Sequence, residues 1–281
     1  MEKRQLDNTG QTLSVLGFGG IVVMNESPDD ACRHVAQAIE RGINYFDVAP
    51  GYGNAEERLG PALEPYRDDV FLACKTGKRT AEEAKIDLHT SLERLLTDHL
   101  DLYQFHGVTR IEDVETILGS GGAMEPVLEA REQGLIRHVG FSTHAEDAAC
   151  LMLDRFKFDS VLFAVNIACW TKGNFGPRIV SKAVDQGVGM LAIKALAKRP
   201  IAEGEERKWP KCWYRPIDQP DEARAALQFT LSRPVTAAIC PGHADLLWLA
   251  CDAIDALASS TEVQEDATVR ELDSEPIFAS N

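Results

Sequence analysis

Eight short apolar runs rich in β-branched residues recur along the chain, and a segment of helical periodicity follows each of them. The runs cover residues 14–22, 44–48, 70–76, 100–106, 138–143, 160–166, 189–195 and 235–241. The helical patterns cover roughly 29–42, 55–65, 80–96, 122–133, 145–155, 176–186, 220–232 and 244–258. Strands that alternate with helices form parallel sheets, and eight such units can close into a barrel. We therefore predict an α/β fold of the (β/α)8 TIM-barrel type.

The alternative with the same alternation is an open, doubly wound sheet. No G-x-G-x-x-G pattern follows the first strand, as a dinucleotide site on such a sheet requires. A length of 281 residues suits one barrel, so we expect residues 1–281 to form a single domain. Ahead of the first barrel strand, MEKRQL and QTLSVL flank Asp7-Asn8-Thr9-Gly10. This pattern predicts a β-hairpin that caps the barrel floor.

Two segments depart from the alternation. Residues 197–220 form a long loop after the seventh strand, and long loops at barrel mouths often bind ligands. Its aromatic residues, with one more after the sixth strand, either build a pocket for a sugar ring or planar carbonyl or pack the loop onto the barrel: Trp170, Trp209, Trp213 and Tyr214. Residues 260–281 are acidic and weakly periodic, which predicts a loosely packed tail.

The composition excludes several classes of function. The formal net charge of −15 argues against a nucleic-acid partner, because phosphate binding needs clustered Lys and Arg, and against binding at a membrane surface. No apolar run approaches the roughly 18 to 20 residues that span a bilayer. The seven cysteines never stand in C-x-x-C spacing, so we expect no metal site. The start, MEKRQLDNTG, lacks the apolar core of a secretory signal, so we expect a cytoplasmic protein.

Four ionisable residues fall at the ends of consecutive predicted strands. Asp47 and Tyr52 follow the second strand, Lys75 ends the third and His106 ends the fourth. Each alone has an ordinary structural explanation, but the carboxyl ends of barrel strands meet at one mouth. A phenol has a pKa near 10, and a neighbouring ammonium favours its ionised form. Lys75 supplies such a cation, with Asp47 to hold it and His106 to donate to a substrate oxygen.

Four stretches together resemble the successive signatures of the aldo-keto reductases: GINYFDVAPGYGNAEERLGPAL, VFLACKTGKR, SLERLLTDHLDLYQFHG and IRHVGFSTH. The resemblance runs, with weakening, from Leu13 to about residue 255. It implies a barrel that binds NADPH or NADH without a Rossmann domain and interconverts a small carbonyl compound and its alcohol. It also implies a monomer.

The resemblance assigns a role to each residue at the strand ends. Tyr52 donates a proton to the carbonyl oxygen as hydride reaches the carbon, and Lys75 lowers the pKa of Tyr52. Asp47 positions Lys75, and His106 orients and polarises the carbonyl.

The resemblance also implies cofactor contacts. Ser142, Thr143 and Asn166 correspond to residues that hold the nicotinamide carboxamide, although Thr143 equally suits a helix N-cap. Gly20, at the end of the first strand, is a further expected contact. Lys194 is expected to reach the pyrophosphate as a point charge, and its alternative role is that of a solvated residue at a strand end.

The segment after the eighth strand, CPGHADLLWLACDA, departs from the family pattern. Gly242 and His243 stand where NADPH-specific relatives place a Lys-Ser pair around the 2′-phosphate, and Trp248 stands where they place an Arg. The only cation that this segment could offer to the 2′-phosphate is a protonated His243. We keep Gly242 and His243 as expected cofactor contacts, and we predict weak discrimination or a preference for NADH.

Two other functions stay open at this point. The first is a lyase or aldolase that uses Lys75 as a Schiff-base nucleophile. The second is a cofactor-sensing subunit that keeps the barrel but has little turnover.

Overall fold

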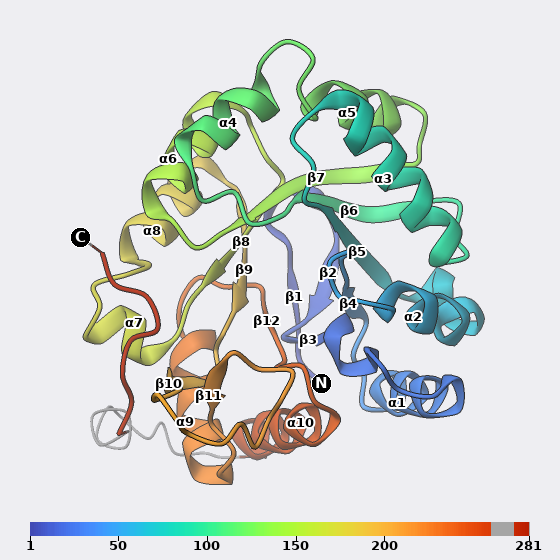
Figure 1. The fold of residues 1–281 in the computed structure, drawn as a ribbon. Coiled ribbons are helices and arrows are strands. Elements are labelled where there is room, and N and C mark those ends of the chain that lie inside the picture. The colour runs from blue at the N-terminus through green and yellow to red at the C-terminus, as the bar shows by residue number, and fades with distance from the viewer. Residues whose placement is uncertain (260–272, 281) are drawn as a thin grey trace.

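Eight parallel strands form a closed barrel in the computed structural model, which describes residues 1–259 and 273–280 (Figure 1). In barrel order the strands are β3 (Leu16–Gly19), β4 (Tyr45–Asp47), β5 (Phe71–Thr76), β6 (Leu100–Phe105), β7 (Ile136–Thr143), β8 (Ser160–Ala164), β9 (Gly189–Ile193) and β12 (Ala237–Ile239). The last strand, β12, pairs with the first, β3. The predicted TIM barrel is confirmed and the open sheet is excluded.

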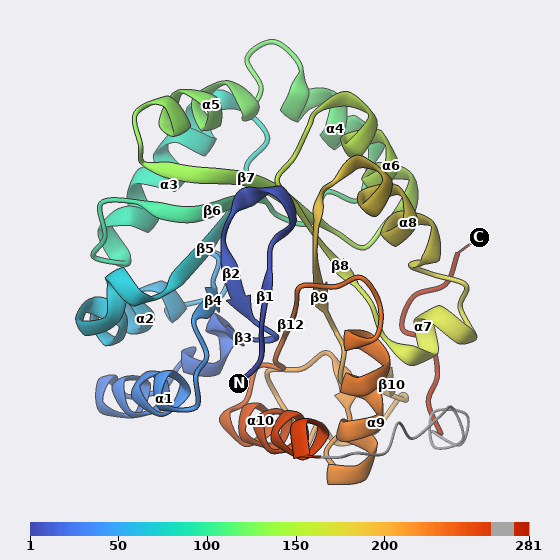
Figure 2. The same cartoon turned by 180° about the vertical axis from the view of Figure 1, so that it is seen from behind.

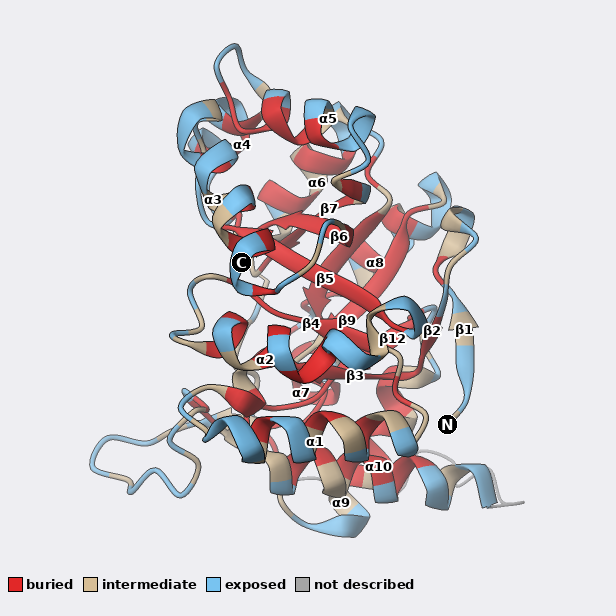
Figure 3. Ribbon diagram, turned by 90° about the vertical axis from the view of Figure 1, so that its right-hand side faces the viewer, coloured by how far each residue is buried: buried red, intermediate tan, exposed pale blue. Residues whose placement is uncertain are grey.

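The strands are buried on both faces because helices cover the barrel from outside. Side chains alternate between the two faces of a strand, so neighbours in sequence enter different cores. Tyr45 and Phe71 fill the barrel interior with Leu102, whereas Phe46 and Leu72 pack toward the helices. Figure 3 shows the barrel strands as mostly buried and the outer helix faces as exposed. Among the described residues, no helix is long and apolar enough to cross a membrane.

All eight predicted helices form. They are α1 (Pro28–Glu40), α2 (Ala55–Leu63), α3 (Ala81–Arg94), α5 (Met124–Glu132), α6 (Glu146–Arg155), α8 (Pro177–Gln186), α9 (Pro220–Leu231) and α10 (Ala244–Ser259). The α1 helix begins as its sequence predicts, because the Ser27 side chain accepts a hydrogen bond from the Asp30 N–H at 3.1 Å. Two short helices, α4 (Ile111–Leu118) and α7 (Ile167–Thr171), were not predicted, since each has too few turns for a clear periodicity.

The amino-terminal hairpin closes the floor of the barrel, as expected. Strands β1 (Lys3–Gln5) and β2 (Thr12–Ser14) pair antiparallel, and Gly10 takes a φ of +75° in the turn between them. Leu6 and Leu13 are fully buried against the interior residues. Figure 2 shows the hairpin lying across this end of the barrel.

The long segment after β9 contains regular structure. Strands β10 (Ala197–Pro200) and β11 (Tyr214–Pro216) form an antiparallel ribbon. Between these strands, the Lys211 ammonium donates hydrogen bonds to Glu26 Oε1 at 2.7 Å and to the Val22 carbonyl at 2.8 Å. Both acceptors lie in the segment after β3. We call residues 201–213 the insert. It therefore lies along one part of the barrel rim, from β9 past β12 to the segment after β3.

The carboxyl-terminal tail falls mainly outside the described residues, which omit 260–272 and 281. Over residues 273–280 the structure differs from a loosely packed tail. The Glu275 N–H donates to the Lys198 carbonyl and the Ser280 N–H to the Gly173 carbonyl, both at 2.9 Å. Phe278 stacks on His144, with ring centroids 4.7 Å apart. Aromatic packing thus holds this segment against the mouth.

Candidate active site

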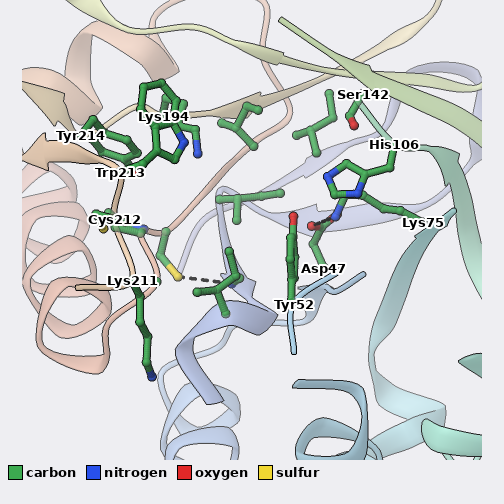
Figure 4. Close-up of a pocket in the computed structure, with 18 of the residues that line it drawn as sticks. Asp47, Tyr52, Lys75, His106, Ser142, Lys194, Lys211, Cys212, Trp213 and Tyr214 are labelled. Carbon is green, nitrogen blue, oxygen red and sulfur yellow. Dashed lines mark hydrogen bonds and ion pairs between the residues drawn. The ribbon is translucent and has the colours of Figure 1, made fainter. Parts of the chain in front are cut away.

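A cavity of about 250 Å³ opens at the carboxyl ends of the barrel strands. The four residues predicted at strand ends all line it: Asp47, Tyr52, Lys75 and His106. Figure 4 shows their side chains together on one side of the cavity, with residues of the insert and of β11 on the other. Residues that are distant in sequence therefore meet at one point, because parallel strands end on the same side of a barrel.

Lys75 and Asp47 form a buried ion pair at the base of the cavity. The Lys75 ammonium donates to Asp47 Oδ1 and, at 3.3 Å, to the Val48 carbonyl. The other carboxylate oxygen accepts from Gln104 Nε2 at 3.0 Å and from the Tyr45 hydroxyl at 3.3 Å. Burial lowers the pKa of Lys75, but Asp47 and Tyr52 outweigh it, and the net shift is upward. Lys75 therefore stays charged and fixed in position.

Tyr52 lies beside this ammonium, which is 5.2 Å from the centroid of its ring. The ring of His106 meets it edge-on, with centroids 5.7 Å apart. Burial raises the pKa of Tyr52, Lys75 opposes the rise, and the net shift is upward. Lys75 does lower the pKa of Tyr52, as expected. The net pKa is nevertheless raised, because the effect of burial is larger than that of Lys75. Tyr52 remains a neutral phenol at neutral pH.

His106 is held by its backbone and is uncharged. Its N–H donates to the Thr76 carbonyl at 2.8 Å, and its carbonyl accepts from Arg79 Nη2 at 2.9 Å. Burial and then the charge of Lys75 lower the pKa of His106 to about 3. A neutral imidazole keeps one N–H, which it can donate to an oxygen in the cavity.

The residues expected to hold a nicotinamide carboxamide divide into two groups. Ser142 lines the cavity, and its hydroxyl oxygen accepts from the Gly107 N–H at 3.0 Å. Thr143 is fully buried and does not line the cavity. Its hydroxyl oxygen accepts a hydrogen bond from the Ala145 N–H at 3.0 Å. It makes a local turn and not the N-cap, since Ala145 occupies that position of α6. His144 lines the cavity instead. Sequence reasoning missed this residue, although it directly follows the Ser-Thr pair expected to contact the cofactor.

Asn166 and Gly20 are absent from the lining of the cavity. The Asn166 oxygen accepts from the Cys169 N–H at 2.9 Å and begins α7. Its Nδ2 is buried and has no hydrogen-bond partner among the described residues. Gly20 is required by packing, because a Cβ there would lie 2.7 Å from Val48 Cγ2. Its neighbours Gly19 and Ile21 line the cavity.

The segment after β12 is occupied by contacts with the insert. His243 Nε2 accepts from the Lys211 N–H at 3.0 Å, and its ring meets Trp209 with centroids 5.2 Å apart. Burial and then Lys211 lower the pKa of His243, so it is neutral at neutral pH. Gly242 lines the cavity, and a Cβ there would lie 2.4 Å from Ile21 Cγ2. The protonated His243 considered from the sequence is therefore not expected.

The aromatic residues of the long segment have different roles. Trp213 and Tyr214 line the cavity, and the Lys194 ammonium lies 5.5 and 4.9 Å from their ring centroids. Trp209 and Trp170 are absent from the lining, and Trp170 packs edge-on against Phe229. Two of the four aromatic residues thus help to form the pocket, and the other two pack outside it.

Comparison with known proteins agrees with this geometry. The model of the Aldo/keto reductase family matches residues 15–237. The chain is 33% identical to the uncharacterized oxidoreductase YqkF of Bacillus subtilis over 51% of its own length and 49% of that protein. It is 29% identical to L-galactose dehydrogenase of Arabidopsis thaliana over 74% of its length and 70% of that protein. The matched region thus spans about half of YqkF.

Solved structures extend the likeness to the whole chain. An aldo-keto reductase from Bacillus halodurans, in its holo form, superposes with a TM-score of 0.75 and 26% identity, over 99% of this chain and 98% of that one. Because the family model covers most of the barrel and the structural match covers nearly all of the chain, this protein belongs to the aldo/keto reductase family of nicotinamide-dependent oxidoreductases.

Proposed function

We propose that this protein reduces an aldehyde or ketone to an alcohol, or catalyses the reverse reaction, with a nicotinamide cofactor and with Tyr52 as the proton donor. The observation that carries the proposal is the convergence of a neutral phenol, a fixed ammonium and a neutral imidazole on one cavity. General acids of this kind must lie within reach of the oxygen that they protonate.

The residues around the cavity fit the nicotinamide end of the cofactor. The buried Nδ2 of Asn166, with no partner among the described residues, is a free donor for a carboxamide oxygen. Ser142 is a second polar group, and Ile193 and Leu162 offer apolar surface to the ring. We assign Gly242 and His243 to the phosphate and adenosine portions, with Thr143 and Gly20 as buried supports of the lining. When bound, the reduced cofactor supplies a hydride.

The side chains of the protein divide the remaining work. Tyr52 gives its proton to the carbonyl oxygen, and the charge of Lys75 stabilises the phenolate that forms. Asp47 keeps Lys75 in place through the buried ion pair. His106, neutral at its low pKa, donates its ring N–H to the same oxygen and orients the carbonyl.

The missing 2′-phosphate clamp predicts the cofactor preference. Neither Gly242 nor Trp248 carries a charge, and the pKa of His243 is lowered. We expect the apoprotein to bind NADH at least about as tightly as NADPH, because no charge-assisted contact favours the phosphate. Separate titrations at one ionic strength, followed by quenching of tryptophan fluorescence, measure both affinities. A preference of tenfold or more for NADPH would contradict the assignment.

A gain-of-function variant provides the control for this measurement. Trp248→Arg introduces a guanidinium where relatives carry one and is expected to raise NADPH affinity about tenfold, since a hydrogen bond to a charged group contributes about 1.5–3 kcal/mol. NADH affinity serves as the internal reference. A parallel change in both affinities would show that residue 248 does not face the 2′ position.

The raised pKa of Tyr52 predicts opposite pH profiles for the two directions. Reduction needs the neutral phenol, which persists up to and beyond the ordinary pKa of about 10. Oxidation of an alcohol needs the phenolate, whose population grows up to about tenfold per pH unit below that pKa. With an uncharged substrate, kcat for reduction should therefore stay flat from about pH 6 to 9, and kcat for oxidation should rise. A reduction rate that falls with a midpoint near pH 7 would exclude Tyr52 as the acid.

The Schiff-base alternative has less support. Lys75 is 1% exposed and paired with Asp47, and its raised pKa keeps it protonated, whereas a nucleophilic amine must be neutral. Borohydride in the presence of a carbonyl substrate would trap a Schiff base on Lys75 if one formed, and we expect no adduct by mass spectrometry. A cofactor-sensing subunit would bind the nucleotide without turnover, which the pH experiment also detects.

A further inference from the structure

Lys194 presents a positive charge to the cavity. It follows the last residue of β9 and adopts a φ of +66°, a left-handed conformation that residues other than glycine rarely take. Its contacts are the rings of Tyr214 and Trp213. No carboxylate of a described residue forms an ion pair with it. The backbone thus accepts an uncommon conformation to place an unpaired ammonium at the cavity wall.

The other lysines of the cavity are already engaged. Lys75 is bound by Asp47, and Lys211 by Glu26 and the Val22 carbonyl. Among the cavity-lining cations of the described chain, Lys194 alone lacks a carboxylate. An ammonium removed from water and left unpaired is unfavourable, and the two aromatic faces offset only part of that cost. An anion that enters the cavity would supply the missing partner.

The position of Lys194 relates it to the reacting end of the cavity. Its charge contributes to the lowered pKa values of His106 and His144, and it interacts electrostatically with Lys75. In Figure 4, Lys194 and Trp213 lie across the cavity from Tyr52 and His106. His243, which we assign to the cofactor, contacts Lys211 and Trp209 of the insert. Lys194 takes no part in these contacts. An anion at Lys194 thus faces the groups that act on a carbonyl.

We propose that Lys194 binds the carboxylate of the substrate, so that this enzyme acts on short oxo acids whose aldehyde or ketone group lies at Tyr52 and His106. The inference rests on the proposed function for its reacting end. The substrate carbonyl takes up a hydride from the reduced cofactor at carbon and a proton from Tyr52 at oxygen, and the carboxylate is unchanged. A cavity of about 250 Å³, shared with a nicotinamide ring, limits the substrate to a small molecule.

A pair of substrates that differ only in charge tests the proposal. We would measure kcat/KM at pH 7 for 4-oxobutanoate and for its methyl ester, with the wild type, Lys194→Met and Lys194→Arg. The wild type should prefer the acid at least about tenfold, mainly through a lower KM, because an ion pair in a partly desolvated site is charge-assisted. Lys194→Met should bring the ratio of acid to ester close to one. Lys194→Arg should keep a preference for the acid.

Lys208, in the insert, offers a matched control. Lys208 also lies over an aromatic ring, 5.0 Å from the centroid of Trp209, but it pairs with Asp218 and does not line the cavity. Lys208→Met should leave the ratio of acid to ester at the wild-type value. Equal efficiencies for acid and ester in the wild type, or an equal proportional loss of both in Lys194→Met, would overturn the proposal.

The cofactor offers the same anionic chemistry through its pyrophosphate, and a binding measurement separates the two sources. Fluorescence titration of the wild type and Lys194→Met with NADH and NADPH should show that, for each nucleotide, the two proteins have affinities within about threefold of each other. A loss of tenfold or more for both nucleotides would assign Lys194 to the pyrophosphate and would refute substrate recognition.

Failure of the proposed function remains distinguishable from failure of this inference. If the wild type reduces neither compound with either nucleotide, and also reduces no member of a panel of uncharged aldehydes and ketones, the reductase assignment is wrong. Equilibrium binding of butanoate and butanamide to the apoprotein, followed by tryptophan fluorescence, then tests the anion site alone. Selective butanoate binding that Lys194→Met abolishes supports the site, and equal binding of both compounds, or no binding of either, overturns it.

Discussion

Replacing Tyr52 with phenylalanine is expected to reduce kcat for carbonyl reduction by about 10²- to 10⁴-fold, the range attributed to a positioned general acid. The substitution removes one oxygen atom from a half-buried ring that already packs beside His106 and Lys75. The fold and the cofactor site should therefore persist. Steady-state reduction of one carbonyl substrate under saturating cofactor measures the effect.

Two controls identify the cause of that loss. Cofactor titration of Tyr52→Phe should give wild-type affinity, because the phenol oxygen serves the substrate. Tyr66→Phe removes the same atom from a ring in the 3-10 helix Glu64–Asp69, which packs on the core away from the cavity, and should leave kcat unchanged. Unchanged turnover in Tyr52→Phe would exclude Tyr52 as the proton donor.

The second large effect is expected from Asp47→Asn. This change leaves the Lys75 ammonium, 1% exposed, with the Val48 carbonyl at 3.3 Å as its other acceptor. Breaking a buried ion pair by removing one partner typically costs about 3–5 kcal/mol of unfolding free energy. The amide oxygen of the variant side chain can still accept from Gln104, so the loss should come from the uncompensated charge. Denaturant unfolding monitored by circular dichroism measures it.

A double substitution separates stability from chemistry. In Asp47→Asn/Lys75→Met both charges are gone, and we expect the double variant to be more stable than Asp47→Asn alone. Activity should not return, since Tyr52 then lacks the cation that stabilises its phenolate. Additive losses of stability in the double variant would mean that the two residues are not coupled. A loss below about 1 kcal/mol in Asp47→Asn would mean that Lys75 finds another partner.

The barrel and the central residues of the site could be predicted because both depend on local patterns. Each β-branched run followed by a helical pattern identifies one strand and its helix, and parallel strands end at a common mouth. Asp47 and Lys75 therefore had to lie close together once their strands were neighbours in the barrel. The short helix α7, by contrast, is stabilised by one capping residue, Asn166, which no periodicity reveals.

Other features of the site depend on contacts between distant segments. His144 faces the cavity while Thr143 turns away, because Thr143 bonds its own turn and Phe278 stacks on the His144 ring from the far end of the chain. Burial and then Lys211, a residue of the insert, lower the pKa of His243, and its Nε2 accepts a hydrogen bond from the Lys211 backbone N–H. Neither partner follows from the local sequence.

The sequence by itself determined the architecture and the chemical set of Asp47, Tyr52, Lys75 and His106, since strand periodicity and strand-end position are properties of short segments. The tertiary structure alone decided how those groups behave and which charges remain free. The pKa of Tyr52 rises because burial outweighs the effect of Lys75, and burial is a sum over the whole fold. Within the described residues Lys194 faces the cavity without a carboxylate partner, because the insert and β11 bring Trp213 and Tyr214 against it.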